Sequence, residues 1–588
     1  MKNTTPKAEN LYEVSWEVCN KVGGIYSVLT TKAQYLQEKY DTYITIGPYI
    51  EEKAKKEFKE QTPPGSIQDA FDQLSKEGIK ARYGEWLIPG QPKTILLEWD
   101  GLRNEVDRYK EELWETYEID SLRSGSDFDN PLLFSKAASK LLQLLEEDKT
   151  ILHAHEWMTG FTILDLDLHD SDINTVFTTH ATMLGRTMAG NGYALYEDLE
   201  SFNSDEEAKN LGVEDKHTTE KATAHTTDIF TTVSEITQKE AKHIHGREPE
   251  ILTMNGLNMK DFPSIEKSSI KHVQNRDLIR EFLSYTFFPY YRFNVENNLT
   301  FMYAGRYEYE NKGLDILIES LARLNERMKE RDDDRTISAF FFVAMPNQGV
   351  KKELFENKNT YRHMKHYVDR NREDIQKSIV DAVIDEKEIE EDIFDTTFLK
   401  SMRRDIYNFK KEGKPPMTSH ELYGDEDDNE IIQLLKEKGL TNEEEDKVKV
   451  MLYPAYLDGN DGLLNLDYHD TLSGSHLGIF PSYYEPWGYT PLESAALGVP
   501  NVTTDLAGFG RFMMKKEEYT GRGIYILNRE QEEKEDIIEN LTDILTDFSN
   551  TNHSERVSEK IMAKQLSKLA DWKNFVNNYI EAHNEALQ

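Results

Sequence analysis

Residues 299–313 read "LTFMYAGRYEYENKG", and this stretch indicates the fold. An apolar run typical of a strand, Leu299–Ala304, leads into a charged turn that ends at Gly313. Leucines at the spacing of a buried helical face follow, at Leu314, Leu317, Leu321 and Leu324. A strand, a turn and a helix in this order form the repeating unit of a parallel sheet that is covered by helices.

The same alternation occurs in two blocks of the chain. The first block runs from "LYEVSWEV" (11–18) to "EILTMNG" (250–256), and the second continues beyond residue 299 with "ISAFFFVAM", "KVKVMLYPAYL", "GSHLGIFPS" and "GVPNVTT". A chain of 588 residues is too long for a single core. Because ligands of open α/β sheets bind beyond the carboxyl ends of the strands, we predict two Rossmann-like domains that face a deep cleft.

The predicted first domain spans residues 1–265 and the second spans residues 266–560. The tail from Ser554 onward is predicted to be one long helix, and we expect its last part, residues 561–588, to pack back on the first domain.

A helical insert is predicted within the second domain. Residues from about 351 to 440 are charged, contain few β-rich runs and show helical apolar spacing at Ile375, Ile379 and Val383. Two interpretations stay open at this point: the insert is a solvated helical hairpin, or it is a contact between subunits of an oligomer.

Composition excludes several classes of function. The formal net charge of −38 opposes binding to nucleic acid and to anionic membranes. No apolar run reaches the length of about 18 residues that a membrane span needs, and the first ten residues do not resemble a signal peptide. Cys19 is the sole cysteine, so neither an intrachain disulfide nor a cysteine-only metal site can form. We expect a cytoplasmic protein.

Two loops at strand ends are suited to an anionic ligand. Arg306 follows a strand and Lys312 precedes a helix, and two cations that flank one loop can hold a diphosphate; the alternative is that they neutralise the neighbouring glutamates. In "KVGGIY", which starts at Lys21, Gly23 and Gly24 permit close approach of a ligand to the free N–H groups of the next helix. The dinucleotide fingerprint is absent, and a simple tight turn is the alternative.

The segment "SYYEPWGYTPLE", residues 482–493, places Glu485 just after the strand "GIF". Thr490 and Glu493, with Pro491 between them, predict a capping box, which gives Glu493 a structural role. Glu485 has no such role, so it is the candidate to bond a polyhydroxylated ligand or to stabilise a developing positive charge. Aromatic neighbours such as Trp487 suit the face of a sugar ring.

Histidines occur in two further strand-end motifs. "HAHEW" contains His153 and His155 on one face of a strand, but a metal site there is the less favoured interpretation because no further ligand cluster is evident. His180 ends another strand, where a structural role is the commoner one. Taken together, a cationic loop for a diphosphate and a carboxylate with aromatics for a sugar predict a nucleotide-sugar glycosyltransferase of the two-domain GT-B type.

Four motifs, "VSWEVCNKVGGIYSVL", "VFTTHATMLGR", "AGRYEYENKG" and "FPSYYEPWGYTPLE", resemble the glycogen synthases of animals and fungi, glycosyltransferase family 3. The resemblance follows the family's order over nearly the whole chain. It implies transfer of glucose from UDP-glucose to the non-reducing end of an α-1,4-glucan, with retention of configuration and without a metal or other cofactor. It also implies a homo-oligomer, with a tetramer as one option, formed through the insert.

The resemblance also implies roles for individual residues. Glu485, His180, Arg306 and Lys312 are the expected catalytic group, in which the two cations bind the donor phosphates. The expected donor-binding residues include a uracil-stacking tyrosine, Tyr468, and a ribose contact, Glu493. The full set of donor-binding residues is Lys21, Gly23, Gly24, Glu156, Arg186, Asn255, Tyr468, Trp487, Gly488, Tyr489, Thr490 and Glu493.

The sequence departs from the family near its end. Regulated members bind glucose 6-phosphate through an arginine-rich helix, whereas "HSERVSEKIMAKQLSKLADWK" has Arg556 as its only arginine, so we expect this control to be lost. The chain stops soon after this stretch, which predicts a shortened member and leaves a bacterial source open. Use of ADP-glucose or another acceptor, an inactive glycogen-binding protein and a phosphorylase remain as alternatives.

Overall fold

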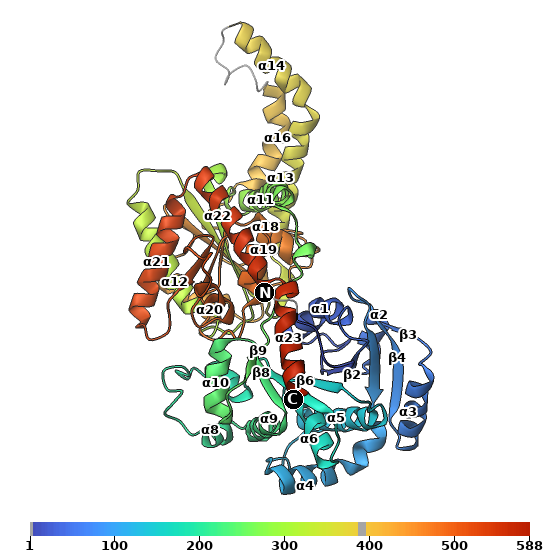
Figure 1. Ribbon diagram of the computed structural model, residues 1–588. Coiled ribbons are helices and arrows are strands. Elements are labelled where there is room, and N and C mark those ends of the chain that lie inside the picture. The colour runs from blue at the N-terminus through green and yellow to red at the C-terminus, as the bar shows by residue number, and fades with distance from the viewer. Residues whose placement is uncertain (1–3, 386–395) are drawn as a thin grey trace.

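The computed structural model describes residues 4–385 and 396–588, with the backbone alone for residues 396–401. Two sheets organise these residues (Figure 1). Within the described chain, the first sheet has nine strands in the order β3-β4-β5-β2-β1-β6-β7-β8-β9, parallel except at the β3-β4-β5 edge. Its strands are β1 Asn10–Val14, β2 Thr42–Pro48, β3 Phe58–Glu60, β4 Lys80–Trp86, β5 Lys93–Glu98, β6 Thr150–His155, β7 Asn174–Thr179, β8 Ile229–Thr232 and β9 Ile251–Leu252.

Helices connect and cover these strands, as the alternating sequence pattern predicted. They are α1 Gly24–Gln37, α2 Glu51–Glu57, α3 Gly65–Lys76, α4 Val106–Tyr117, α5 Ser126–Leu144, α6 Trp157–Leu168, α7 Met183–Gly190, α8 Ser204–Asn210, α9 Glu214–Thr226 and α10 Glu235–His245.

The second sheet is parallel and has six strands among the described residues, in the order β14-β11-β10-β15-β16-β17. The predicted leucine stripe of the helix that follows β10, α12 Leu314–Lys329, is fully buried against β10 and β11, which explains the spacing in the sequence. The strands are β10 Asn298–Ala304, β11 Thr336–Phe342, β14 Val448–Tyr453, β15 Leu477–Ile479, β16 Asn501–Thr504 and β17 Ile524–Leu527. The helices are α11 Ile265–Phe287, α12 Leu314–Lys329, α17 Glu430–Glu437, α18 Tyr468–Gly474, α19 Tyr489–Ala496, α20 Gly508–Met514 and α21 Lys534–Asn550.

The helical insert is shorter than the sequence predicted. Helices α13 Lys352–Arg370, α14 Arg372–Ile384 and α16 Thr396–Phe409 project from the second domain (Figure 1). In sequence they lie between two short strands that pair antiparallel, β12 Asn347–Val350 and β13 His420–Leu422. Helix α17, which lies within the predicted insert, buries Ile431, Ile432 and Leu435 in the core of the second domain. Residues 386–395 of the predicted insert lie outside the described residues.

The tail is two helices rather than one. Helix α22, His553–Ser567, packs on α19, and α23, Trp572–Ala586, crosses to the first domain and contacts α1 and β7 (Figure 1). Asp571 caps α23 by accepting from the Lys573 N–H at 3.0 Å. The Trp572 N–H donates to the Leu257 carbonyl, and this bond to the first domain redirects the chain. Among the described residues, none of the helices combines the length and the apolarity of a membrane span.

Candidate active site

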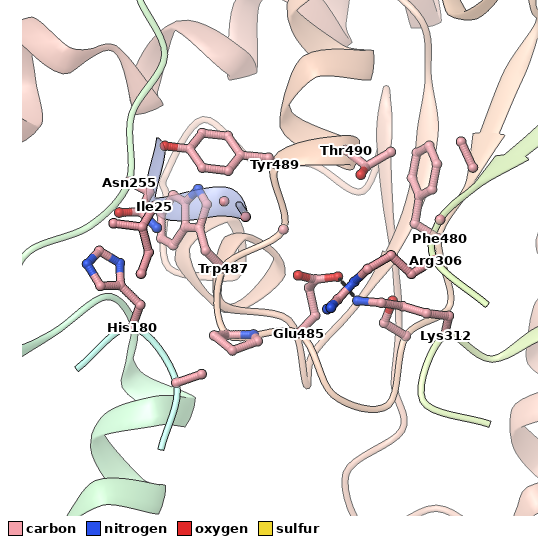
Figure 2. Close-up of a pocket in the computed structure, with 18 of the residues that line it drawn as sticks. Ile25, His180, Asn255, Arg306, Lys312, Phe480, Glu485, Trp487, Tyr489 and Thr490 are labelled. Carbon is pink, nitrogen blue, oxygen red and sulfur yellow. Dashed lines mark hydrogen bonds and ion pairs between the residues drawn. The ribbon is translucent and has the colours of Figure 1, made fainter. Parts of the chain in front are cut away.

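A cavity of about 840 Å³ lies between the two sheets, at the carboxyl ends of their strands. All of the predicted catalytic and donor-binding residues line it except Lys21, whose exposed side chain lies over the ring of Tyr26 instead. Figure 2 shows the two walls: the first domain contributes Ile25, His180 and Asn255, and the second contributes Arg306, Lys312 and Glu485. The cavity therefore brings together residues that are up to 470 positions apart in sequence, from Gly23 to Glu493, as their places at strand ends predict.

Lys312 and Glu485 form the ion pair at the centre of the second-domain wall. Lys312 Nζ lies 2.7 Å from Glu485 Oε2, and both side chains are largely shielded from solvent. Gly313 follows with φ of 67°, and a side chain there would collide with the Pro481 carbonyl. Only glycine fits this close approach, which holds the Lys312 loop against the segment that carries Glu485.

Arg306 shares the same loop but is paired differently. Its guanidinium lies 3.0 Å from Glu308 Oε1, and its side chain is 74% exposed. The neutralising partner that the sequence left open is therefore present for Arg306, while Lys312 pairs with the site carboxylate. An exposed guanidinium at the mouth of the cavity can still turn toward a phosphate, because such surface pairs are weak.

The predicted capping box at Thr490 and Glu493 is wrong. Helix α19 begins at Tyr489 after Gly488, which has φ of 106°, and within the described part of the chain no side chain caps it. The positive φ at Gly488 turns the chain into the helix one residue earlier than the Thr-Pro pattern suggests. Glu493 instead faces Tyr468 and His469, and burial together with this carboxylate raises the pKa of Tyr468 well above its usual range. The N-terminus of α19 is thus left open toward the cavity.

The turn at Gly23 and Gly24 is already occupied by a carboxylate. Glu17 Oε2 accepts from the N–H groups of Val22 at 3.3 Å, Gly23 at 2.7 Å and Tyr26 at 3.0 Å. The prediction that these N–H groups are free is therefore wrong, and Glu17 was not among the predicted site residues, although it stands six residues before Gly23 in the same motif. A bound anion at this turn would have to compete with Glu17, so this wall favours a neutral, hydroxyl-rich ligand.

The first-domain wall is built around Glu156. Its backbone has φ of 66°, a strained conformation for a residue other than glycine, and its Oε1 accepts from the His180 N–H at 2.9 Å. Burial raises the pKa of Glu156 to about 8, against the opposing charge of Arg186. Asn255 presents a buried side-chain oxygen to the same wall, and this oxygen has no hydrogen-bond partner among the residues that the structure describes. Polar atoms without partners in a cavity indicate a polar ligand.

Trp487 supports the site from behind rather than facing it with its whole ring. The side chain is 3% exposed, and its ring packs against Phe509, Phe512 and Phe575. Because Phe575 lies on α23, this aromatic cluster ties the Glu485 loop to the C-terminal helix. The prediction of an aromatic sugar platform therefore does not fit Trp487, which instead fixes the loop.

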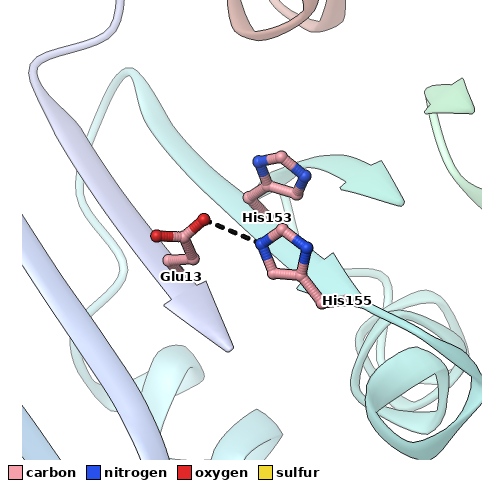
Figure 3. Close-up of side chains that lie close together, drawn as sticks. All are labelled: Glu13, His153 and His155. Carbon is pink, nitrogen blue, oxygen red and sulfur yellow. Dashed lines mark hydrogen bonds and ion pairs between the residues drawn. The ribbon is translucent and has the colours of Figure 1, made fainter. Parts of the chain in front are cut away.

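His153 and His155 gain a third polar neighbour, Glu13, from the adjacent strand β1 (Figure 3). The three side chains are buried, and one ligand atom from each lies within 4.8 Å of the others. However, the ammonium group of Lys32 also contacts the Glu13 carboxylate. A second cation beside this ammonium would be repelled, so the set suits hydrogen bonding better than metal binding.

Glu240 links the first domain to the Glu485 loop, and no motif in the sequence points to it. Its Oε1 accepts from the Tyr484 hydroxyl at 3.0 Å and also from Thr182. Burial raises the pKa of Glu240 to about 7. Since Tyr484 directly precedes Glu485, this carboxyl group helps to set the distance between the two walls.

The cations near the C-terminus form a second cluster outside the cavity. Lys560 of α22 lies partly buried beside Arg556 and Arg276, and desolvation and these charges lower the pKa of Lys560 well below its usual range. Arg276 belongs to α11, far away in sequence. The sequence of the tail contains Arg556 as its only arginine, so it does not reveal that α11 contributes a second guanidinium group at this place.

Comparison with known proteins agrees with this geometry. A family model described as glycogen synthase matches residues 13–588. The chain belongs to the glycogen synthase family. It is 34% identical to the liver glycogen [starch] synthase of Homo sapiens over 98% of this chain and 83% of that protein, and 35% identical to the glycogen [starch] synthase of Caenorhabditis elegans over 98% and 88%. The corresponding protein of Neurospora crassa is 33% identical over 98% and 83%.

Solved structures identify the fold of this family member. The catalytic domain of starch synthase IV from Arabidopsis thaliana, bound to ADP and acarbose, matches with a TM-score of 0.52 at 13% identity over 99% of both chains. The two-domain GT-B architecture predicted from the sequence is confirmed. Family membership makes the chain a glycosyltransferase with a glucosyltransferase role in glycogen synthesis.

Proposed function

We propose that the cavity binds UDP-glucose and transfers its glucosyl group, with retention, to the non-reducing end of an α-1,4-glucan. The observation that carries this proposal is the Lys312–Glu485 pair beside the uncapped N-terminus of α19. A cation and free N–H groups side by side suit a diphosphate, and the neighbouring carboxylate suits a hexose. The relatives' names supply the glycogen product.

Breaking the bond between glucose and phosphate creates negative charge on the diphosphate and positive charge at the anomeric carbon. Lys312, Arg306 and the N-terminus of α19 would stabilise the first charge. Glu485 would stabilise the second. In the free protein Lys312 neutralises Glu485, so donor binding would move the ammonium group toward the phosphates. We favour a front-face attack assisted by the leaving diphosphate over a double displacement.

The remaining wall residues would hold the rest of the donor. Tyr468 would stack on uracil and Glu493 would accept from the ribose hydroxyls. His180, Glu156, Arg186 and Asn255 would surround the hexose. No metal or other cofactor is part of this proposal, and full activity in the presence of a chelator would support it.

An assay of glucose incorporation into glycogen with UDP-glucose and with ADP-glucose tests the proposal. A higher kcat/KM with UDP-glucose than with ADP-glucose supports the proposal. A higher kcat/KM with ADP-glucose would show that ADP-glucose is the donor instead. Absence of transfer from either donor would indicate an inactive glycogen-binding protein.

A parallel series with glucose 6-phosphate tests the expected loss of control by this ligand. The result bears on the cation cluster that contains Arg276 and Arg556. A phosphorylase would instead show the absorbance of a lysine-bound pyridoxal group.

We also propose a cytoplasmic homo-oligomer, with a tetramer as one option, in which the insert supplies the contact. Helix α14 exposes Val380, Val383 and Ile384 to solvent along one stretch. Light scattering of Val383→Asp tests the contact, since a charge there should shift the protein to a smaller species. Gln376→Asp, at an exposed polar position of the same helix, is the matched control.

A further inference from the structure

A buried chain of hydrogen bonds leads from the cavity into the core of the first domain. His180 Nε2 lies 3.0 Å from His155 Nδ1, and His155 Nε2 lies 2.7 Å from Glu13 Oε1. Glu13 and His155 are completely buried and His180 is 7% exposed. Neither Glu13 nor His155 lines the cavity, so any effect they have on the reaction passes through His180.

The environment fixes the charge of each member of the chain. Burial by itself opposes ionisation of Glu13, but Lys32 and His155 hold the pKa of this carboxyl well below its usual range. Burial lowers the pKa of both His155 and His180, and the nearby Lys32 acts in the same direction on each. Glu13 is therefore a carboxylate, and the two imidazoles are neutral with one N–H group each.

Neutral imidazoles beside a carboxylate can bond in one order only. A carboxylate accepts, so His155 donates its proton from Nε2 and keeps Nδ1 as an acceptor. His180 must then donate from Nε2 to His155, which leaves His180 Nδ1 as a lone pair. This atom has no hydrogen-bond partner among the described residues, and its ring is turned toward Asn255 at the cavity wall (Figure 2).

We propose that Glu13 and His155 are positioning residues that fix the ring orientation and tautomer of His180, so that His180 Nδ1 accepts a hydrogen bond from a hydroxyl group of the donor hexose. This rests on the proposed function, which places the hexose at this wall. The hydrogen-bonded chain Glu13–His155–His180, here called the relay, is also held at its Glu13 end. Tyr43 donates to Glu13, and Lys32 lies 4.2 Å from the ring centroid of Tyr579 on the C-terminal helix.

Two substitutions of His155 separate its two bonds. In His155→Gln the longer amide can still donate to Glu13 but no longer accepts from His180, whereas in His155→Asn the shorter amide can accept from His180 but loses Glu13. His153 offers a matched control. It stands on the same strand, is equally buried and also bonds a histidine through Nδ1 and an oxygen through Nε2, namely His583 and Thr178.

We expect His155→Gln to lower kcat with UDP-glucose about tenfold, the effect of one hydrogen bond to the hexose that is lost or misdirected. The Kd for UDP, which carries no hexose, should stay unchanged. His155→Asn should retain more turnover than His155→Gln, and His153→Gln should retain nearly all of it at a comparable loss of Tm. Equal kcat in folded His155→Gln and His153→Gln would overturn the proposal.

The tautomer of His180 is a second readout, which needs neither a turnover assay nor the His155 variants. In wild-type protein labelled with ring ¹⁵N-histidine, the signal that disappears in His180→Asn should report a neutral ring protonated on Nε2. A ring protonated on Nδ1 would overturn the relay even if His155 variants fail to fold. Failure of the proposed function has a different signature, because wild-type protein would then transfer no glucose while the tautomer remained as described.

Discussion

Replacing Glu485 by glutamine should separate turnover from binding of the leaving group. The amide keeps the size of the side chain and removes its charge, so the developing positive charge at the hexose loses its electrostatic partner. Loss of one such preorganised group costs about 3 kcal/mol of transition-state stabilisation, or roughly 100-fold in kcat.

The Lys312–Glu485 pair sets the sign of the effect on binding. The side chains are 13% and 26% exposed, and a pair that is partly open to solvent is worth roughly 1 kcal/mol. Without this pair Lys312 is free for the phosphates, so UDP should bind about fivefold more tightly to Glu485→Gln.

Steady-state incorporation of labelled glucose into glycogen measures kcat, and titration calorimetry with UDP measures Kd. If kcat stays within tenfold of the wild-type value, the assignment of Glu485 is refuted. If UDP binds more weakly to the variant, the ion pair does not compete with the phosphates in the way described.

Three further perturbations follow from the same geometry. Arg306→Ala should weaken UDP binding and lower kcat/KM, each by roughly tenfold or more, because a charge-assisted phosphate contact acts in ground and transition states. If neither value changes in the same two assays, Arg306 only neutralises Glu308. Glu240 has a folded pKa of about 7, above its unfolded value of 4.5, so its stabilising contribution is complete below about pH 4.5 and is lost as the pH rises to 7. Between about pH 5 and pH 8, the free energy of unfolding of the wild type should therefore fall by up to about 3 kcal/mol more than that of Glu240→Gln. Urea unfolding at a series of pH values measures this difference, and identical pH profiles would contradict the pKa shift. Trp572→Ala should lower the free energy of unfolding by about 3–5 kcal/mol, since the indole is fully buried and donates to Thr31 at 2.7 Å; a loss below about 1 kcal/mol would show that the tail contributes little to the fold.

Much of the site could be predicted because strand ends are local features. Arg306, Lys312 and Glu485 each stand directly after a β-rich run or before a helical one, and parallel strands place all such positions at one edge. The errors at Thr490 and in the tail have a common cause. A cap or a helix break depends on one backbone torsion or on one bond to a segment far away in sequence, here at Gly488 and Leu257, and sequence periodicity does not report either.

The sequence by itself determined two α/β domains, their order along the chain and the strand-end residues of each, because periodicity and turn chemistry act over a few residues. Only the tertiary structure decided what those residues meet. It brought Glu13 next to His155 and His180 through the β1-β6-β7 strand order, and it filled the Gly23 turn with the carboxylate of Glu17. Such partners are selected by sheet order and burial, which sum contacts over the whole chain and leave no local pattern in the sequence.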